Sequence, residues 1–225
     1  PAETGPPLRP AEAILADYAQ AVGGRDAWKR LRSLHAKRDL TVAGQGASGH
    51  EEHWATADGK SFGEWSLTGV GSFRQGFDGR GAWSQDPVFG LRKLEGVELE
   101  EARIGGAWNA EPDLASLYVK VISVPPPKDA GPDLECVELH KRLGKPAVLC
   151  FDAQTHLRAR QTGVQPSPGG EIPYTIVFGD WRETSGIKTW FYEKMTAGPS
   201  TIEARTTSLK HNEKIPAKKF RMPKP

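Results

Sequence analysis

Short runs of alternating apolar and polar residues, separated by turn signals, are the feature that most constrains the fold of this chain. Residues 34–42 read LHAKRDLTV, with apolar side chains at Leu34, Ala36, Leu40 and Val42. Alternation with a period of two is typical of a half-buried strand. Similar runs recur along the chain, and the 25 Gly and 18 Pro supply many turns between them. This pattern predicts an antiparallel sheet.

Three other segments are helix-like. Apolar residues recur at helical spacing over residues 11–22, after a proline and before a Gly-Gly pair, which predicts a helix with a defined start and stop. A short helical piece over residues 25–31 is expected to bury Trp28 and Leu31. Residues 95–118 are acidic and helix-like, with interruptions at a Gly-Gly pair and a proline. We therefore expect an N-terminal helical region and a central helical insertion.

The predicted order is a helix, about four strands, the helical insertion, and about six more strands. A sheet of that many strands twists and curls rather than staying flat, and the helices have to cover its concave face. The expected fold is α+β and mainly β: a strongly curved antiparallel sheet that forms an incomplete β-barrel, covered by the N-terminal helix and the insertion. Residues 1–10 are expected to be a disordered or processed leader, and residues 11–225 a single domain.

Composition argues against several classes of function. The formal net charge is only +2, which gives no general electrostatic case for binding nucleic acid. The Lys-rich end, from Lys210 to Lys224, is expected to be a solvated terminal strand. No stretch approaches the ~20 apolar residues that are needed to span a bilayer. The polar start of the chain is compatible with export.

The motifs that could carry catalysis or bind a metal are weak. Residues 44–49 read GQGASG, but they join two predicted strands rather than a strand and a helix, so a hairpin loop is the better interpretation. His50 and His53 point to opposite faces of a strand, which does not suit a shared metal ion. There is no G-x-S-x-G motif. We expect no catalytic residue, no metal and no cofactor, with a hydrolase as a minor alternative.

The two cysteines, Cys136 and Cys150, lie in the predicted hairpin ECVELHKRLGKPAVLCFD. A loop of three or five residues centred on Leu143 places them opposite each other, where they can form a disulfide. A disulfide would imply an oxidising compartment. A different turn slips the register by one residue and separates them. Both arrangements are compatible with the sequence.

Large apolar side chains are distributed over many of the predicted strands. Ordinary core packing accounts for any one of the aromatic residues, but together they supply more bulk than one sheet face and two helices require. A ligand pocket would use them. Phe77 and Trp83, on either side of the Asp78–Gly79 turn, are also expected to pack on the sheet. The candidate cavity-lining residues are Leu40, Trp54, Phe62, Trp65, Phe73, Phe77, Trp83, Leu117, Phe178, Trp190 and Tyr192.

Five segments carry a resemblance to a known family. They read, in order, AILADYAQAVGGRDAWKRLRSLHAK, GFDGRGAWSQDPVFG, FDAQTHLRAR, FGDWRETSGIKTW and HNEKIPAKKF. This series resembles exported bacterial proteins related to the lipoprotein carriers LolA and LolB, over about residues 11–223. The resemblance implies a LolA-like half-barrel with helices that plug its open side. In that family an arginine on an early strand holds the helical lid shut, and Arg38 is the candidate for this lid contact.

The resemblance also implies a function. Members of this family receive the acyl chains of lipoproteins or other lipids in an apolar interior, without catalysis. We therefore expect a carrier in the periplasm or associated with the outer membrane. Its expected partners are a lipid or acylated lipoprotein, membrane-associated donor and acceptor proteins, and a transient contact with the membrane, but no nucleic acid. The alternative is an envelope scaffold or sensor whose own side chains fill the barrel.

Overall fold

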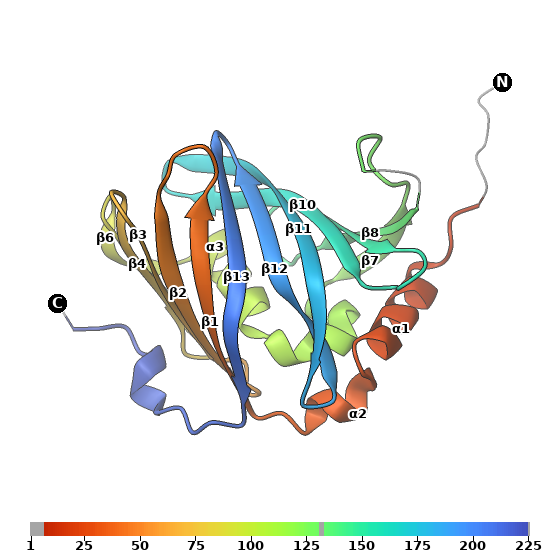
Figure 1. Cartoon of the computed structure of the whole chain (residues 1–225), viewed down its shortest axis with the longest axis horizontal. Helices are drawn as coiled ribbons and strands as arrows, with labels where there is room; N and C mark the ends of the chain where they lie inside the picture. The colour runs from red at the N-terminus through yellow and green to blue at the C-terminus, as the bar shows by residue number, and fades with distance from the viewer. Residues whose placement is uncertain (1–6, 131–132, 225) are drawn as a thin grey trace.

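The strands form one antiparallel sheet that curls around the helices (Figure 1). The computed structural model describes residues 7–130 and 133–224. Within these ranges the sheet has thirteen strands in the order β6-β5-β4-β3-β2-β1-β13-β12-β11-β10-β9-β8-β7, and no pairing joins its two end strands, β6 and β7. The sheet is therefore an open barrel. This confirms the predicted fold class.

Six strands precede the helical insertion and seven follow it. The first six are β1 (Ser33–Val42), β2 (Ser48–Thr56), β3 (Ser61–Leu67), β4 (Gly71–Phe77), β5 (Ala82–Asp86) and β6 (Gly90–Leu94). The others are β7 (Lys120–Val124), β8 (Leu134–His140), β9 (Ala147–Asp152), β10 (Arg158–Ser167), β11 (Gly170–Thr184), β12 (Ile187–Ala197) and β13 (Ser200–His211). The sequence predicted fewer strands because short strands such as β6 have too few alternations to be recognised.

The N-terminal helices end where the sequence predicts. The first helix is α1 (Ala11–Ala21), and α2 (Gly24–Lys29) follows it after Gly23, which has a φ of 106°. A Cβ atom on Gly23 would lie 2.6 Å from the carbonyl oxygen of Gly186. Glycine is required here both by the left-handed backbone and by the close approach of the β11–β12 turn.

The predicted insertion forms two helical pieces, α3 (Gly96–Gly106) and the 3₁₀ segment η1 (Trp108–Leu117). They connect the two end strands of the sheet and lie inside its curve (Figure 1). Together with α1 and α2 they form what we call the helical cover. None of the helices in the described ranges is long and apolar enough to cross a membrane.

The main core lies between the N-terminal helices and strands β8 to β12. Tyr18 of α1 packs against Phe151 of β9, with ring centroids 4.9 Å apart. Strands β8 and β9 also contain the two cysteines. Cys136 of β8 lies directly opposite Cys150 of β9, and the two form a disulfide. The structure therefore selects the register in which the cysteines face each other.

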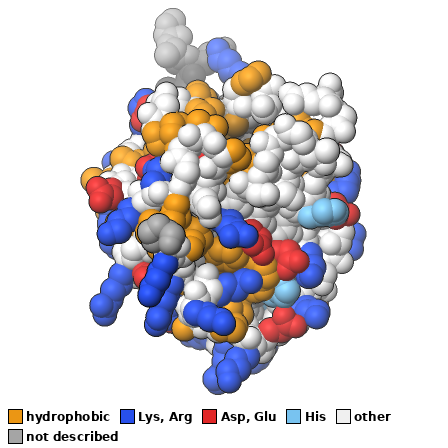
Figure 2. All heavy atoms as spheres, turned by 90° about the vertical axis from the view of Figure 1, so that its left-hand side faces the viewer, with side chains coloured by type: hydrophobic (Ala, Val, Ile, Leu, Met, Phe, Trp, Pro, Cys, Tyr) orange, Lys and Arg blue, Asp and Glu red, His pale blue; other side chains and the backbone are white. Residues whose placement is uncertain are grey.

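The C-terminal end differs from its predicted form as a solvated strand. Strand β13 ends at His211, and residues 212–224, which we call the C-terminal strap, then cross the outer face of the sheet (Figure 1). The strap contains a short 3₁₀ turn, η2 (Ala217–Phe220), and its Phe220 is only 1% exposed. The Lys residues suggested solvation, but Ile215, Phe220 and Met222 pack against the sheet. Figure 2 shows Lys and Arg beside apolar side chains on the side of the molecule where the chain ends.

Part of the predicted leader, residues 1–6, lies outside the described residues. Arg9, in the remaining part, donates hydrogen bonds to Glu135 at 2.7 and 3.0 Å and to Asp17 at 2.5 Å. The chain therefore contacts the folded domain from Arg9 onward.

Candidate functional site

A cavity of about 380 Å³ lies between the concave face of the sheet and the helical cover. Its volume falls within the range of roughly 300–1,000 Å³ that is typical of small-molecule sites. Strand β1 contributes Leu34 and Ala36 from its inward phase, and the short side chain of Ala36 leaves room above the sheet. The other apolar lining residues include Trp28, Ile104, Ala107, Trp108, Leu114, Leu117, Trp190 and Leu209.

Two of the predicted lining residues, Leu117 and Trp190, border this cavity. Others lie elsewhere along the strands. Leu40 and Trp65 pack with Val42, Leu67 and Ala204 in a separate apolar cluster.

Three further candidates are also used in packing. Phe73 stacks on Trp65, with ring centroids 5.6 Å apart. Phe77 is buried against Ala102 of α3, under the helical cover. Phe178 lies in the main core with its ring edge-on to Trp190. These residues support the walls of the barrel and do not border the cavity.

The prediction that Trp54, Phe62, Trp83 and Tyr192 line the cavity has to be corrected. Trp54 follows a residue that borders the cavity, His53, so its side chain projects to the outer face. Phe62 and Trp83 lie in the same outer row and are covered by Phe220. The remaining candidate, Tyr192, lies under the guanidinium of Arg205, 4.5 Å from its ring centroid. Aromatic content alone did not reveal which face of each strand is covered by the helices.

Charged residues from three strands meet at one end of the cavity. Arg38 of β1 donates hydrogen bonds to Glu51 of β2 at 2.7 Å and to Glu193 of β12 at 3.3 Å. We call these three residues, together with His53, the polar corner. Burial acts to lower the pKa of Arg38, but the two carboxylates outweigh it and hold that pKa above its ordinary value. Arg38 is therefore bonded within the sheet, and the predicted contact with the lid is corrected.

The imidazole of His53 borders the cavity beside this ion-pair cluster. The pKa of His53 is lowered to about 4, chiefly by burial; Glu51 opposes the shift and the nearby Arg38 adds to it. The ring is therefore neutral near pH 7. A neutral imidazole has one nitrogen that donates and one that accepts a hydrogen bond.

A second arginine joins the sheet to the helical cover. The guanidinium of Arg158 on β10 lies 2.5 Å from the carboxylate of Glu111 in η1, and Tyr18 of α1 donates a hydrogen bond to the same carboxylate. Burial would lower the pKa of Arg158, but Glu111 raises it overall. Burial raises the pKa of Tyr18. This cluster therefore joins β10, η1 and α1. Removing one partner of such a buried pair would leave an uncompensated charge.

Two further ion pairs hold the insertion in place. The ammonium of Lys141, in the β8–β9 loop, is buried and donates to Glu101 of α3. Arg103 of α3 donates to Glu100 and to the carbonyl oxygen of Leu117, both at 2.8 Å. These residues and the Arg158–Glu111 pair were not among the site residues predicted from the sequence. The sequence signal that could have indicated these buried ion pairs is the presence of charged side chains at inward-facing positions of helix-like and strand-like segments.

A second depression, of about 830 Å³, lies on the outside of the helical cover. It runs between α1, α2, the end of η1 and β7, and the exposed ion pair of Arg25 and Asp113 lies along it at 3.0 Å. The inner cavity is the better candidate site because it combines apolar walls with buried charged groups. Among the described residues, no cluster of three or more His, Cys, Asp or Glu side chains is placed to hold a metal ion.

Comparisons with known proteins identify the fold. No protein-family model matches the chain, and no curated protein matches its sequence. A LolA superfamily protein from Nitrosomonas europaea has a similar structure, with a TM-score of 0.55 and 12% identity, over 95% of this chain and 98% of that one. A DUF1329 family protein from Desulfovibrio piger gives a TM-score of 0.57 and 12% identity over the same shares of the two chains.

A third similar structure is a domain from Vibrio parahaemolyticus that is named for outer-membrane lipoprotein sorting. Its TM-score is 0.50 and its identity 12%, over 92% of this chain and 94% of that one. At this level of identity the similarity concerns the fold and not the ligand. The chain thus has the open-barrel fold of LolA superfamily structures, as the sequence resemblance implied.

Proposed function

We propose that this protein binds a lipid, or the acyl part of a lipidated protein, in the cavity beneath the helical cover and carries it within the cell envelope. The observation that carries the proposal is a space of about 380 Å³ with apolar walls inside the open barrel. Each methylene group removed from water contributes roughly 0.8 kcal/mol, so an acyl chain gains substantially by entering it. The fold shared with LolA superfamily structures supports the same proposal.

Release of such a ligand requires the cover to move. The insertion α3–η1 joins the two end strands, which do not pair with each other. The described contacts that hold it include the ion pair of Arg158 and Glu111 and that of Lys141 and Glu101. A ligand shifts the balance between closed and open states by its difference in affinity for the two. We therefore assign to Arg158, and not to Arg38, the tie between sheet and cover.

The envelope location belongs to the same proposal. A disulfide between Cys136 and Cys150 forms and persists in oxidising compartments such as the periplasm. Membrane-associated donor and acceptor proteins would be required for a carrier, since the ligand has to enter and leave. The alternative of a scaffold with a filled barrel is less favoured, because the interior contains open space.

A binding titration tests the proposal. Delipidated protein is titrated with N-phenyl-1-naphthylamine, an uncharged probe that fluoresces in apolar surroundings, and a micromolar or tighter Kd is expected. Ala107→Phe, at the cavity wall, should weaken binding by about tenfold or more because the new ring occupies the space. Ala115→Phe provides the control, since Ala115 is exposed on the outer side of η1. A flat titration with folded wild-type protein would contradict the proposal.

A further inference from the structure

The charges around the cavity do not balance. The lining residues and their direct ion-pair partners contain four carboxylates, from Glu51, Glu101, Glu111 and Glu193. They contain three cations, from Arg38, Lys141 and Arg158. His53 adds no charge near pH 7. One carboxylate is therefore in excess, and its position decides which ligand headgroup the cavity favours.

The excess lies in the polar corner. Glu111 is paired with Arg158 and Glu101 with Lys141, whereas two carboxylates share the single guanidinium of Arg38. Of these two carboxylates, Glu51 is held closely at 2.7 Å.

Glu193 is the carboxylate with spare capacity. Its Oε2 atom accepts from Arg38 and from the indole N–H of Trp190, both at 3.3 Å. Its Oε1 atom accepts no hydrogen bond from any residue that the structure describes. An ionised carboxylate offers about four acceptor positions on its two oxygens, so Glu193 can bind another donor. Because it borders the cavity, that donor can be a ligand.

Two neighbours strengthen this interpretation. The neutral ring of His53 also borders the cavity, and no hydrogen bond joins its nitrogens to another described residue. The indole of Trp190 lies on the same wall, where its N–H orients Glu193 and its ring faces the guanidinium of Arg158, 5.5 Å from the ring centroid. The corner therefore offers hydrogen-bond acceptors, whereas both arginines at the cavity are already bonded to carboxylates.

We propose that the cavity prefers an amphiphile with a cationic headgroup, such as a primary ammonium, which binds Glu193 beside His53 while its chain lies along Leu117 and Trp108. This inference rests on the proposed function, since it names the ligand class of the same site. An anionic headgroup would meet the excess carboxylate, and every arginine or lysine among the described lining residues is already paired. The formal net charge of the whole chain is +2, so general attraction to the surface does not favour a cation.

The experiment compares three ligands that differ only in the headgroup: dodecylamine, dodecan-1-ol and dodecanoate. Each competes with N-phenyl-1-naphthylamine near pH 7, below its critical micelle concentration. We expect dodecylamine to bind about tenfold more tightly than dodecan-1-ol, which corresponds to about 1.4 kcal/mol, and dodecanoate to bind most weakly. Glu193→Gln should remove most of the preference for the amine, measured as the ratio of the Kd values of dodecan-1-ol and dodecylamine in the same variant.

The matched control is Glu203→Gln, because Glu203 lies on β13 with its side chain on the outer face beside Arg205. This variant should keep the preference for the amine. If dodecanoate equals or exceeds dodecylamine in the wild type, or if the preference survives Glu193→Gln, the inference is overturned and the proposed function stands. If folded protein binds the probe and none of the dodecyl ligands, the inference also fails. If it binds neither the probe nor the ligands, the proposed function fails with it.

Discussion

The two faces of strand β2 differ in what covers them. His53 faces a cavity that remains open, whereas the next residue, Trp54, lies on the outer face beneath the C-terminal strap. The inner face keeps open space and buried charged groups under the helical cover. The outer face carries aromatic residues, and the protein's own chain fills the position that a ligand could take. Aromatic content alone therefore does not identify a ligand surface. A ligand surface is identified by whether another segment of the chain already covers it.

The outer row is closely packed. The indole N–H of Trp83 donates to the carbonyl oxygen of Phe220 at 3.1 Å. The ring of Trp83 lies over Gly76, where a Cβ atom would come within 2.4 Å of the indole nitrogen. Lys219 places its ammonium 3.3 Å from the ring centroid of Trp54. These contacts fix the strap on the sheet.

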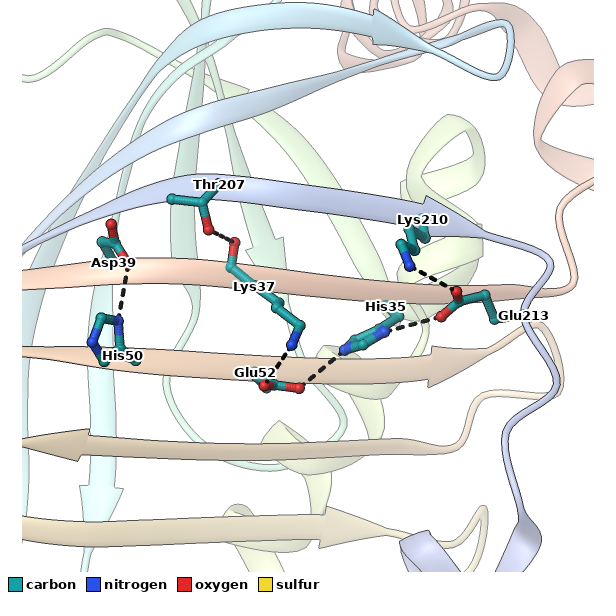
Figure 3. A network of polar contacts seen from close by, with 8 residues as sticks. All are labelled: His35, Lys37, Asp39, His50, Glu52, Thr207, Lys210 and Glu213. Atoms are coloured by element: carbon teal, nitrogen blue, oxygen red, sulfur yellow. Dashed lines mark hydrogen bonds and ion pairs between the residues drawn. The ribbon is translucent and has the colours of Figure 1, made fainter.

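The start of the strap is held by a polar network on the same face (Figure 3). His35 lies between two carboxylates, with Nε2 3.1 Å from Glu52 and Nδ1 3.0 Å from Glu213. Lys37 and Lys210 pair with these same carboxylates, at 3.0 and 3.3 Å. Glu52 and Glu213 are therefore each matched by a lysine at the surface, in contrast to the excess carboxylate in the cavity.

A pair of tryptophan substitutions should separate the two faces and give the largest effect. Trp83→Ala is expected to lower the free energy of unfolding by about 3–5 kcal/mol, because it removes a large, fully packed side chain. Trp190→Ala, at the half-buried cavity wall, should cost about 1–2 kcal/mol and weaken binding of the uncharged probe. Urea denaturation and the probe titration measure the two quantities.

Trp83→Ala should leave the affinity for the probe unchanged wherever the protein remains folded. The assignment of the two faces would be contradicted if Trp83→Ala lowered the free energy of unfolding by less than about 1 kcal/mol and abolished probe binding. In that case the outer row, and not the cavity, would be the ligand surface.

The buried imidazole in the cavity should give a pH-dependent effect of intermediate size. The pKa of His53 is about 4 in the folded protein, compared with 6.5 for an unperturbed histidine. Above pH 6.5 the ring is neutral in both states and contributes nothing. As the pH falls from 6.5 to 4, the unfolded state takes up the proton first, so the folded state loses up to about 3 kcal/mol.

His53→Gln removes this proton uptake, so its stability should fall less than that of the wild type between pH 6.5 and 4. Urea denaturation at a series of pH values measures the difference between the two proteins. Carboxylates with lowered pKa values, such as Asp78 and Asp152, affect both proteins equally and cancel in the difference. Parallel stability curves would show that His53 is not buried in a neutral form.

The smallest expected effect concerns the cation above the outer row. Lys219→Ala should lower the free energy of unfolding by about 0.5–1 kcal/mol, because the ammonium of Lys219 lies over the ring of Trp54. Lys218→Ala is the matched control, since Lys218 is exposed on the neighbouring position. Thermal denaturation of the two variants measures the difference. Equal stability of both would mean that the strap is held by Phe220 and its apolar neighbours alone.

Much of the fold could be predicted from local patterns. The period-two alternation of residues 34–42 predicted β1, and the Gly-Gly pair after residue 22 predicted the end of the first helix. The cysteine positions allowed a facing register, which the structure adopts. The candidate site was less predictable, since Arg158 and Glu111 lie far apart in the sequence and show no pattern that joins them.

The sequence by itself determined most of the element types and the curled antiparallel sheet, because periodicity and turn chemistry act between residues that are close along the chain. Only the tertiary structure decided which face of each strand encloses the cavity. Alternation divides residues such as His53 and Trp54 between two faces but does not say which face a distant segment will cover. That choice depends on where the helical cover and the C-terminal strap find the apolar surface that they bury, and those contacts are not local.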